Sequence, residues 1–178
     1  TIKPFVYTFA IDHLGLTPCT MVPNLPTTIE TANGTAWSPK EAGKVEQNGE
    51  LHPLSWGLAR SRNNYSAWIM KQAKQPQAVA NFIHNMGIHS YIDPVPALCL
   101  GTSESNVYEM VSAFSTFANE GVYTTPIFVT RIEDRQGNLI ASFAPRTQDA
   151  ISEHTAYTML TMLEGVIRSG TGGRLGWA

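Results

Sequence analysis

Residues 1–11 read TIKPFVYTFAI, a strongly patterned helical segment. Its apolar side chains recur every three or four residues, a spacing that places them on one face of an amphipathic α-helix. These side chains are Ile2, Phe5, Val6, Phe9 and Ala10. Proline fits only the first turn of a helix, where its missing N–H would be unpaired anyway. Pro4 therefore predicts that this helix starts at or just before Thr1.

Four further segments have helical periodicity together with start or stop signals. They cover residues 65–74, 76–86, 106–119 and 152–170. Asn106 and Glu109 form a capping-box pattern ahead of an apolar stripe that includes Val107 and Val111. Ser152 is the expected cap of the last helix.

The rest of the chain predicts one β-hairpin and one long irregular segment. Residues 127–133 and 139–143 have strand composition and flank a turn at 136–138. Residues 15–57 hold five prolines and several Gly/Asn turns, and long structured loops usually shape a site. A length of 178 residues suits one domain. The pattern thus predicts an α+β fragment that is mainly α, with a β-hairpin and too few strands for a complete sheet.

The composition argues against nucleic acid and membrane surfaces as partners. The chain has 12 basic and 14 acidic residues, a net charge of −2, and no cluster of Lys and Arg longer than two neighbours. Nucleic acids and anionic membranes are recognised through basic patches. No apolar run approaches the roughly 18 residues that a membrane span needs, and nothing resembles a signal peptide. We therefore expect any membrane anchor to lie outside this segment.

Residue types that bind metals are scattered along the chain. The five histidines show no HExxH or similar spacing, and no P-loop or G-x-G-x-x-G motif is present. We therefore expect no metal and no other cofactor. Cys19 and Cys99 also lack metal-ligand spacing. They could pair as a disulfide in an oxidising compartment, or both could be free, buried thiols.

Two short polar segments are candidates for a functional site. Lys3 lies one residue round from the apolar stripe of the first helix, where it could simply extend its ammonium into water. Residues 59–68 read ARSRNNYSAW, in which a serine, an arginine and two asparagines crowd ahead of a helix. Ser61 or Asn64 could there be an ordinary helix cap. When each segment is considered by itself, a solvent-exposed lysine and an ordinary helix cap are the favoured interpretations.

Together with their surroundings, these segments resemble a known family, the transpeptidase domain of class A (bifunctional) penicillin-binding proteins. That family carries Ser-x-x-Lys in the phrase G-S-T-x-K-P-F, and this chain begins with T-I-K-P-F. Its second motif, Ser-x-Asn, matches Ser61-Arg62-Asn63. Further family phrases follow in family order: WSPKEAG (37–43), LGTSE (100–104), MVSAFSTFANEGVYTTP (110–126), RIEDRQGNLI (131–140) and HTAYTMLTMLEGVI (154–167).

The resemblance implies that residues 1–178 are a partial penicillin-binding transpeptidase domain. The nucleophilic serine would immediately precede Thr1, and the third motif, Lys-Thr-Gly, would follow shortly after Ala178. The complete domain would have the serine β-lactamase/transpeptidase fold, a five-stranded antiparallel sheet flanked by helices. This segment would be its helical part.

The implied chemistry can be followed from the residue types. A serine hydroxyl is a weak nucleophile and needs an adjacent base, and a lysine three residues further along a helix lies on the same face. Lysine is a base only if its pKa is lowered, which partial burial promotes. The resemblance makes Lys3 the base and Ser61 the proton relay to the leaving amine. Asn63 would hold both the lysine and the substrate backbone.

By the same resemblance, the parent protein would be a peptidoglycan D,D-transpeptidase. It would take stem peptides ending in D-Ala-D-Ala, form a serine acyl-enzyme and be acylated by β-lactam antibiotics. It would work at the bacterial cell envelope, on the periplasmic face of the cytoplasmic membrane, with an anchor and a glycosyltransferase domain outside these residues. We expect residues 1–178 alone to be inactive. Two alternatives remain: a non-catalytic relative acting as β-lactam sensor or cell-wall scaffold, and an unrelated helical interaction module.

Overall fold

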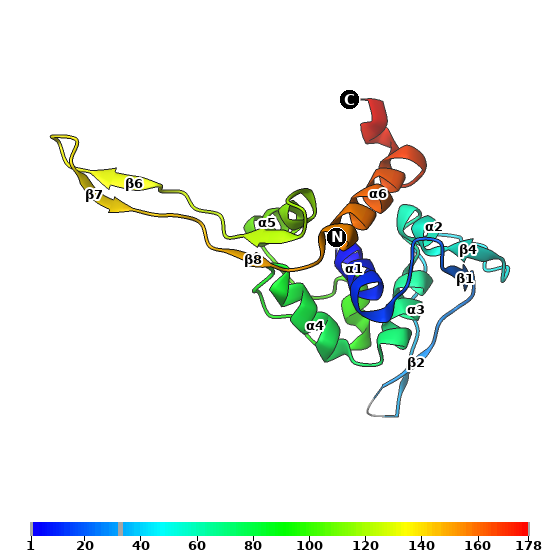
Figure 1. Cartoon of the computed structure of the whole chain (residues 1–178). Coiled ribbons are helices and arrows are strands. Elements are labelled where there is room, and N and C mark those ends of the chain that lie inside the picture. The colour runs from blue at the N-terminus through cyan, green and yellow to red at the C-terminus, as the bar shows by residue number, and fades with distance from the viewer. Residues whose placement is uncertain (1, 32–33, 178) are drawn as a thin grey trace.

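Helices form the body of the molecule, and small two-stranded sheets extend from it (Figure 1). The structure is a computed structural model that describes residues 2–31 and 34–177. Its helices are α1 (Lys3–Leu14), α2 (Leu54–Ala59), α3 (Asn63–Ala73), α4 (Pro76–Asn85), α5 (Val107–Ala118) and α6 (Glu153–Ser169), with 3-10 turns η1 (Pro96–Leu100) and η2 (Gly173–Trp177). Its strands are β1 (Met21–Pro23), β2 (Ile29–Glu30), β3 (Ala36–Trp37), β4 (Leu51–Pro53), β5 (Val122–Thr124), β6 (Arg131–Glu133), β7 (Leu139–Ser142) and β8 (Thr147–Asp149). The predicted fold class, α+β and mainly α, is confirmed.

Helix α1 lies in the middle of the helical body, where it contacts α2, α3, α4 and α6. Every residue from Pro4 to Ala10 is buried, including Tyr7 and Thr8, which lie off the predicted apolar face. The prediction of an amphipathic helix is therefore wrong, since a helix buried around its circumference belongs to the core. The Thr8 hydroxyl donates to the Pro4 carbonyl at 2.7 Å, so it needs no partner from another element.

The start of α1 also differs from the prediction. The helix begins at Lys3, and Pro4 occupies its first turn as expected. Thr1, where the sequence placed the start, lies outside the described residues. Lys3 is thus the first residue of a buried helix, with its side chain at the edge of the core.

The capping box predicted for α5 is half right. The Asn106 side chain accepts a hydrogen bond from the backbone N–H of Glu109 at 2.8 Å. The Glu109 carboxylate instead accepts from the Ser90 hydroxyl at 2.6 Å, which ties α5 to the segment after α4. The predicted apolar stripe is wrong at Val107 and Val111, which are 79% and 61% exposed.

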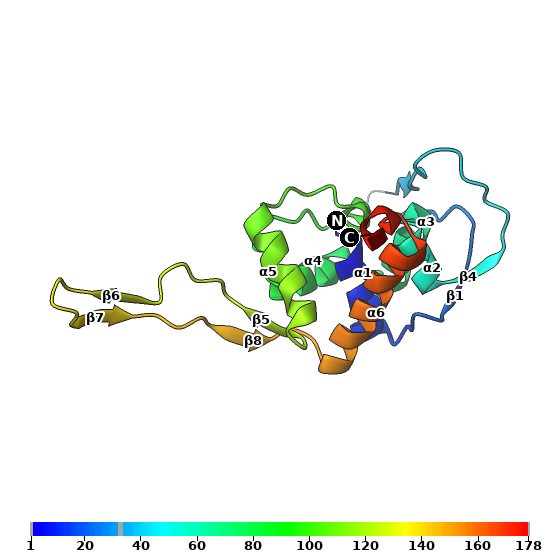
Figure 2. The same ribbon diagram turned by 90° about the horizontal axis from the view of Figure 1, so that it is seen from above.

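The predicted hairpin is the outer part of a longer ribbon that projects from the helical body (Figures 1 and 2). Strand β6 pairs antiparallel with β7, and nearer the body β5 pairs with β8. The outer strands are shorter than predicted, because residues 127–130 lie outside β6. The Asp134 carboxylate closes the turn by accepting from the N–H groups of Gln136 and Asn138, both at 2.8 Å.

The segment predicted as irregular, residues 15–57, contains two small sheets and the start of α2. Strand β1 pairs antiparallel with β4, and β2 with β3. Each strand has two or three residues, too few for the alternation that marks a strand in a sequence. Between β3 and β4 the chain passes beside the N-terminal end of α3, where it contributes to the site described below.

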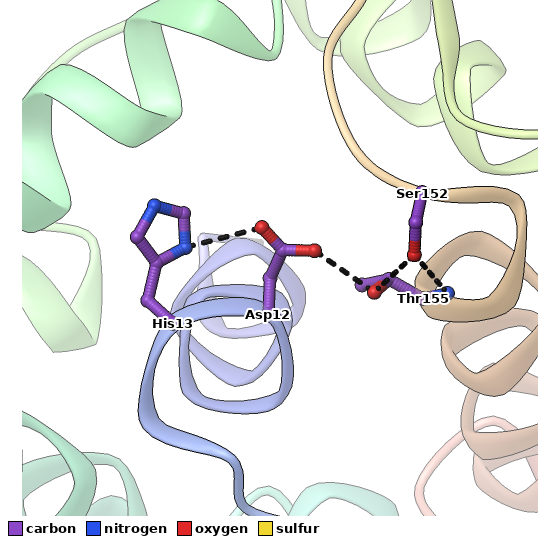
Figure 3. A network of polar contacts seen from close by, with 4 residues as sticks. All are labelled: Asp12, His13, Ser152 and Thr155. Carbon is purple, nitrogen blue, oxygen red and sulfur yellow. Dashed lines mark hydrogen bonds and ion pairs between the residues drawn. The ribbon is translucent and has the colours of Figure 1, made fainter.

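A short polar network ties the end of α1 to the start of α6 (Figure 3). The Thr155 hydroxyl donates to Asp12 Oδ1 at 2.9 Å, and Asp12 Oδ2 lies 3.2 Å from His13 Nδ1. Ser152 caps α6 as predicted, accepting from the Thr155 N–H at 3.0 Å. The network fixes α1 against α6 at the end of the helix opposite Lys3.

Candidate active site

Lys3, Ser61 and Asn63, the three predicted site residues, meet in the structure. Lys3 Nζ lies 2.6 Å from the Ser61 carbonyl oxygen, 3.0 Å from Ser61 Oγ and 2.7 Å from Asn63 Oδ1. The contact joins the first residue of α1 to the turn between α2 and α3. Lys3 is therefore held by three protein acceptors, which rules out the interpretation that it simply extends into water.

The partners of Lys3 suit either of its protonation states. The Ser61 carbonyl oxygen and Asn63 Oδ1 can only accept hydrogen bonds, whereas the Ser61 hydroxyl can donate or accept. A protonated Lys3 donates to all three. A neutral Lys3 can donate to the two pure acceptors and receive the hydroxyl proton on its lone pair. The arrangement can therefore hold the amine in place while it gains or loses a proton.

Burial lowers the pKa of Lys3 below its ordinary value of 10.5, and the negative charge of Glu41 and the nearby Cys99 act in the opposite direction. Cys99 is fully buried, and burial raises the pKa of its thiol to about 12. The thiol is thus neutral near pH 7, so Glu41 is the charged neighbour that opposes the effect of burial there. Cys99 and the exposed Cys19 are both free thiols, so the disulfide alternative is wrong, as is the burial expected for Cys19.

The turn that carries Ser61 is fixed by the end of α2. Ser61 has a left-handed backbone conformation, φ 54°, which is unfavourable for a residue with a Cβ. Its N–H donates to the Leu58 carbonyl, and the next N–H donates to Gly57, both at 2.9 Å. Gly57 also allows close packing of α2 on α3, since a Cβ there would overlap the ring of Tyr65. The strained turn places both the carbonyl and the hydroxyl of Ser61 beside Lys3.

Arg62, the middle residue of the motif, anchors the turn on the other side. Its guanidinium carbon lies 5.0 Å from the centre of the Trp56 ring, within the range of a cation–π contact. The Trp56 ring in turn stacks on His52, with centroids 4.0 Å apart and an angle of 14° between the planes. This stack joins the turn to both α2 and β4.

Glu41 and the Lys40 carbonyl are parts of the site to which the sequence assigned no role. The Glu41 carboxylate accepts from the backbone N–H groups of Asn63, at 3.2 Å, and Asn64, at 2.8 Å. The predicted alternative of a cap by Ser61 or Asn64 is therefore wrong, because the cap comes from Glu41 in the loop between β3 and β4. Glu41 lies in the family phrase WSPKEAG, which the sequence did reveal. This phrase is far from the Ser61-Arg62-Asn63 motif along the chain, so no local pattern indicated that the two are in contact.

The chain is similar to known proteins over most of its length. Residues 97–177 match the model of a family described as the penicillin-binding protein transpeptidase domain. Penicillin-binding protein 1A of Neisseria meningitidis is 31% identical over 179 aligned positions, which include 96% of this chain. The chain is thus similar, over almost its whole length, to penicillin-binding protein transpeptidases. It spans 22% of the length of the Neisseria relative. The resemblance drawn from the motifs is thereby confirmed.

Solved structures of penicillin-binding proteins share the fold. The crystal structure of penicillin-binding protein 1A from Haemophilus influenzae has a TM-score of 0.76 at 22% identity, over 96% of this chain and 30% of that one. The imipenem acyl-enzyme complex of penicillin-binding protein A from Mycobacterium tuberculosis has a TM-score of 0.80 at 15% identity, over 94% of this chain and 42% of that one. At these identities the likeness concerns the fold.

Two further properties concern the described part of the chain. Across residues 2–31 and 34–177, no group of three or more His, Cys, Asp or Glu side chains is placed to hold a metal ion. Within the same ranges, no helix combines the length and apolarity of a membrane span.

Proposed function

We propose that this chain provides the general base, the proton relay and the amide clamp of a peptidoglycan D,D-transpeptidase. The observation that carries the proposal is the contact of a half-buried Lys3 with Ser61 and Asn63. Similarity to penicillin-binding protein transpeptidases supports the reaction class. The substrate would be a stem peptide ending in D-Ala-D-Ala, and β-lactams would acylate the same nucleophile.

The proposed nucleophile is a serine immediately before Thr1, three residues upstream of Lys3, a spacing that brings two side chains to the same face wherever the backbone is helical. Neutral Lys3 takes the proton from the serine hydroxyl as Oγ attacks the carbonyl carbon of the penultimate D-alanine. The tetrahedral intermediate then collapses, and its C–N bond breaks. The leaving amine of the last D-alanine receives a proton from Lys3 through the Ser61 hydroxyl. An amine of a second stem peptide then attacks the acyl-enzyme, and the proton it loses returns to the serine.

Asn63 is proposed to serve the lysine and the substrate together. Its Oδ1 accepts from Lys3 Nζ at 2.7 Å, which holds the amine at the edge of the core. In the complete site, the same amide would line the groove in which the backbone of the stem peptide lies. The site needs no metal or organic cofactor for this reaction, since the acyl group is carried by the serine itself.

The chain would then be a partial transpeptidase domain of a longer protein at the bacterial cell envelope. The proposed location is the periplasmic side of the cytoplasmic membrane, where peptidoglycan is cross-linked. Any glycosyltransferase activity would belong to a separate domain of that longer protein. For residues 1–178 alone we propose that neither cross-linking nor covalent penicillin binding takes place, because the nucleophile is not among them.

The test is labelling of the longer protein with a fluorescent penicillin. Lys3→Met removes the base, so we expect the labelling rate constant to fall by roughly 10²- to 10⁴-fold, the usual contribution of general acid–base catalysis. Lys71→Met is the matched control, because this lysine is exposed on α3 and away from the turn. Labelling at an unchanged rate in the Lys3→Met protein would contradict the proposal. Stable labelling of residues 1–178 alone would contradict their proposed inactivity.

A further inference from the structure

We propose that Glu41 is a positioning residue of this site, which fixes the start of α3 so that Asn63 faces Lys3 and balances the charge of the lysine. The proposal rests on the function proposed above and assigns the loop between β3 and β4 a part in it. It concerns a carboxylate that would act through Lys3 and Asn63, without contacting the substrate.

The first observation is the way in which Glu41 caps α3. Its two oxygens each accept one hydrogen bond, Oε2 from the Asn63 N–H at 3.2 Å and Oε1 from the Asn64 N–H at 2.8 Å. The first N–H groups of a helix have no partner inside it, and its N-terminal end carries a partial positive charge. A carboxylate therefore satisfies two donors at once and fixes the backbone from which the Asn63 side chain extends.

The second observation is that the neighbouring residue orients the Asn63 amide. Asn63 Nδ2 donates to the Lys40 carbonyl at 2.6 Å, while Asn63 Oδ1 accepts from Lys3 Nζ at 2.7 Å. A carbonyl can only accept and an ammonium can only donate, so the amide has one possible orientation. Residues 40 and 41 together determine that the oxygen of Asn63 points at the lysine.

The loop that carries Glu41 is itself fixed to α3 by a second set of contacts. The Ser38 hydroxyl donates to the Thr27 carbonyl at 2.9 Å. The Thr27 hydroxyl donates to the Asn64 carbonyl at 3.2 Å, and both Thr27 and Asn64 are buried. The carboxylate is therefore presented by a loop that is hydrogen-bonded, through Thr27, to the start of α3.

The third observation concerns charge. The pKa of Lys3 is lowered by burial, and the Glu41 carboxylate raises it. Cys99 also acts on the pKa of Lys3, but its thiol is neutral near pH 7, since burial raises its pKa to about 12. Glu41 thus opposes the effect of burial on the pKa of Lys3 and favours the protonated amine.

The test compares Glu41→Gln and Glu41→Asp with Glu46→Gln, which removes the same charge from an exposed position five residues along the loop. In residues 1–178, NMR of lysine labelled at Cε and Nζ follows the titration of Lys3, and amide exchange reports on the start of α3. Glu41→Gln is expected to move the Lys3 titration to lower pH. It should also speed exchange at Asn63 and Asn64 by roughly tenfold, which corresponds to the loss of one hydrogen bond to a charged group.

Glu41→Asp retains the charge on a shorter side chain, so the Lys3 titration should stay closer to that of the unchanged chain while amide exchange increases. A Glu41→Gln variant that exchanges faster but leaves the Lys3 titration in place would reduce Glu41 to a helix cap and overturn the proposal. So would an equal shift in Glu46→Gln. In the longer protein, the acid limb of the pH profile of penicillin acylation should move to lower pH in Glu41→Gln. Absence of acylation in the unchanged longer protein would contradict the proposed function, whereas the Lys3 titration would still decide the role of Glu41.

Discussion

A half-buried lysine with three hydrogen-bond acceptors around it differs in its acid–base behaviour from a lysine in water. Lys3 keeps its hydrogen bonds in both protonation states, because one of its partners is a hydroxyl that can reverse its role. Burial lowers its pKa and Glu41 limits that decrease. These two opposing effects set the fraction of neutral amine that is available as a base.

The lowered pKa of Lys3 leads to a prediction for the pH dependence of the free energy of unfolding. The folded chain releases this proton at a lower pH than the unfolded chain, whose lysine has its ordinary value near 10.5. Between the two values the unfolded state binds more protons, so the Lys3 contribution to the free energy of unfolding rises with pH. We therefore expect the stability of the unchanged chain, relative to Lys3→Met, to increase over this window in urea denaturation. Parallel pH curves for the two chains would contradict the lowered pKa.

The backbone of Ser61 gives a second prediction at the same scale. Its φ of 54° is costly for any residue with a Cβ and is free of strain for glycine. Ser61→Gly and Ser61→Ala both remove the hydroxyl, so their difference reports on the backbone alone. We expect the glycine variant to be more stable by about 1 kcal/mol, measured by chemical denaturation. Equal stability would show that the turn relaxes when the hydroxyl is absent.

At the scale of elements, the contact between α1 and α6 determines how the lysine-bearing helix sits in the body. Thr155→Val keeps the shape of the side chain but removes the donor to Asp12, which is 23% exposed. We expect a loss of about 1 to 2 kcal/mol in the free energy of unfolding, typical of a hydrogen bond to a charged group. Thr161→Val is the control, because its exposed hydroxyl bonds only to its own helix. Similar losses in both variants would mean that the network in Figure 3 adds no stability.

The elements also show how far sequence patterns reach. Helices α3 to α6 were predicted to within about two residues, because they carry both an apolar period and terminal signals. The strands of two or three residues between 15 and 57 were missed, since such lengths carry no period. Helix α1 was expected to have a polar face, yet Tyr7 and Thr8 are buried because neighbouring helices surround it. Burial on several sides depends on tertiary packing that a single segment does not reveal.

At the scale of the whole molecule, the site joins segments that are distant along the chain. The motif resemblance brought Lys3, Ser61 and Asn63 together before any geometry was known, although 58 positions separate the first two. No role was predicted for Glu41, because that role depends on the contact between the loop that carries it and the start of α3. A contact of that kind has no local pattern. It follows from the arrangement of β1–β4 and α3.

The helical body and the projecting ribbon differ in how many of their side chains are buried. Helices α1, α3 and α4 each contribute more residues to the core than the other helices do, whereas the outer ribbon leaves side chains such as Phe128, 86% exposed, in solvent. Figure 2 shows this ribbon extending away from the helices that hold the site. The geometry around Lys3 therefore depends on the helical body and on the loop that carries Glu41.

The most direct test is to find the atom that a β-lactam acylates in the longer protein. We predict that mass spectrometry of peptides after benzylpenicillin treatment locates one adduct on a serine immediately before Thr1. The Lys3→Met protein should form that adduct much more slowly at the same pH. An adduct on Ser61 or on any other residue, or equal rates of formation in the two proteins, would contradict the assignment of Lys3 as the base.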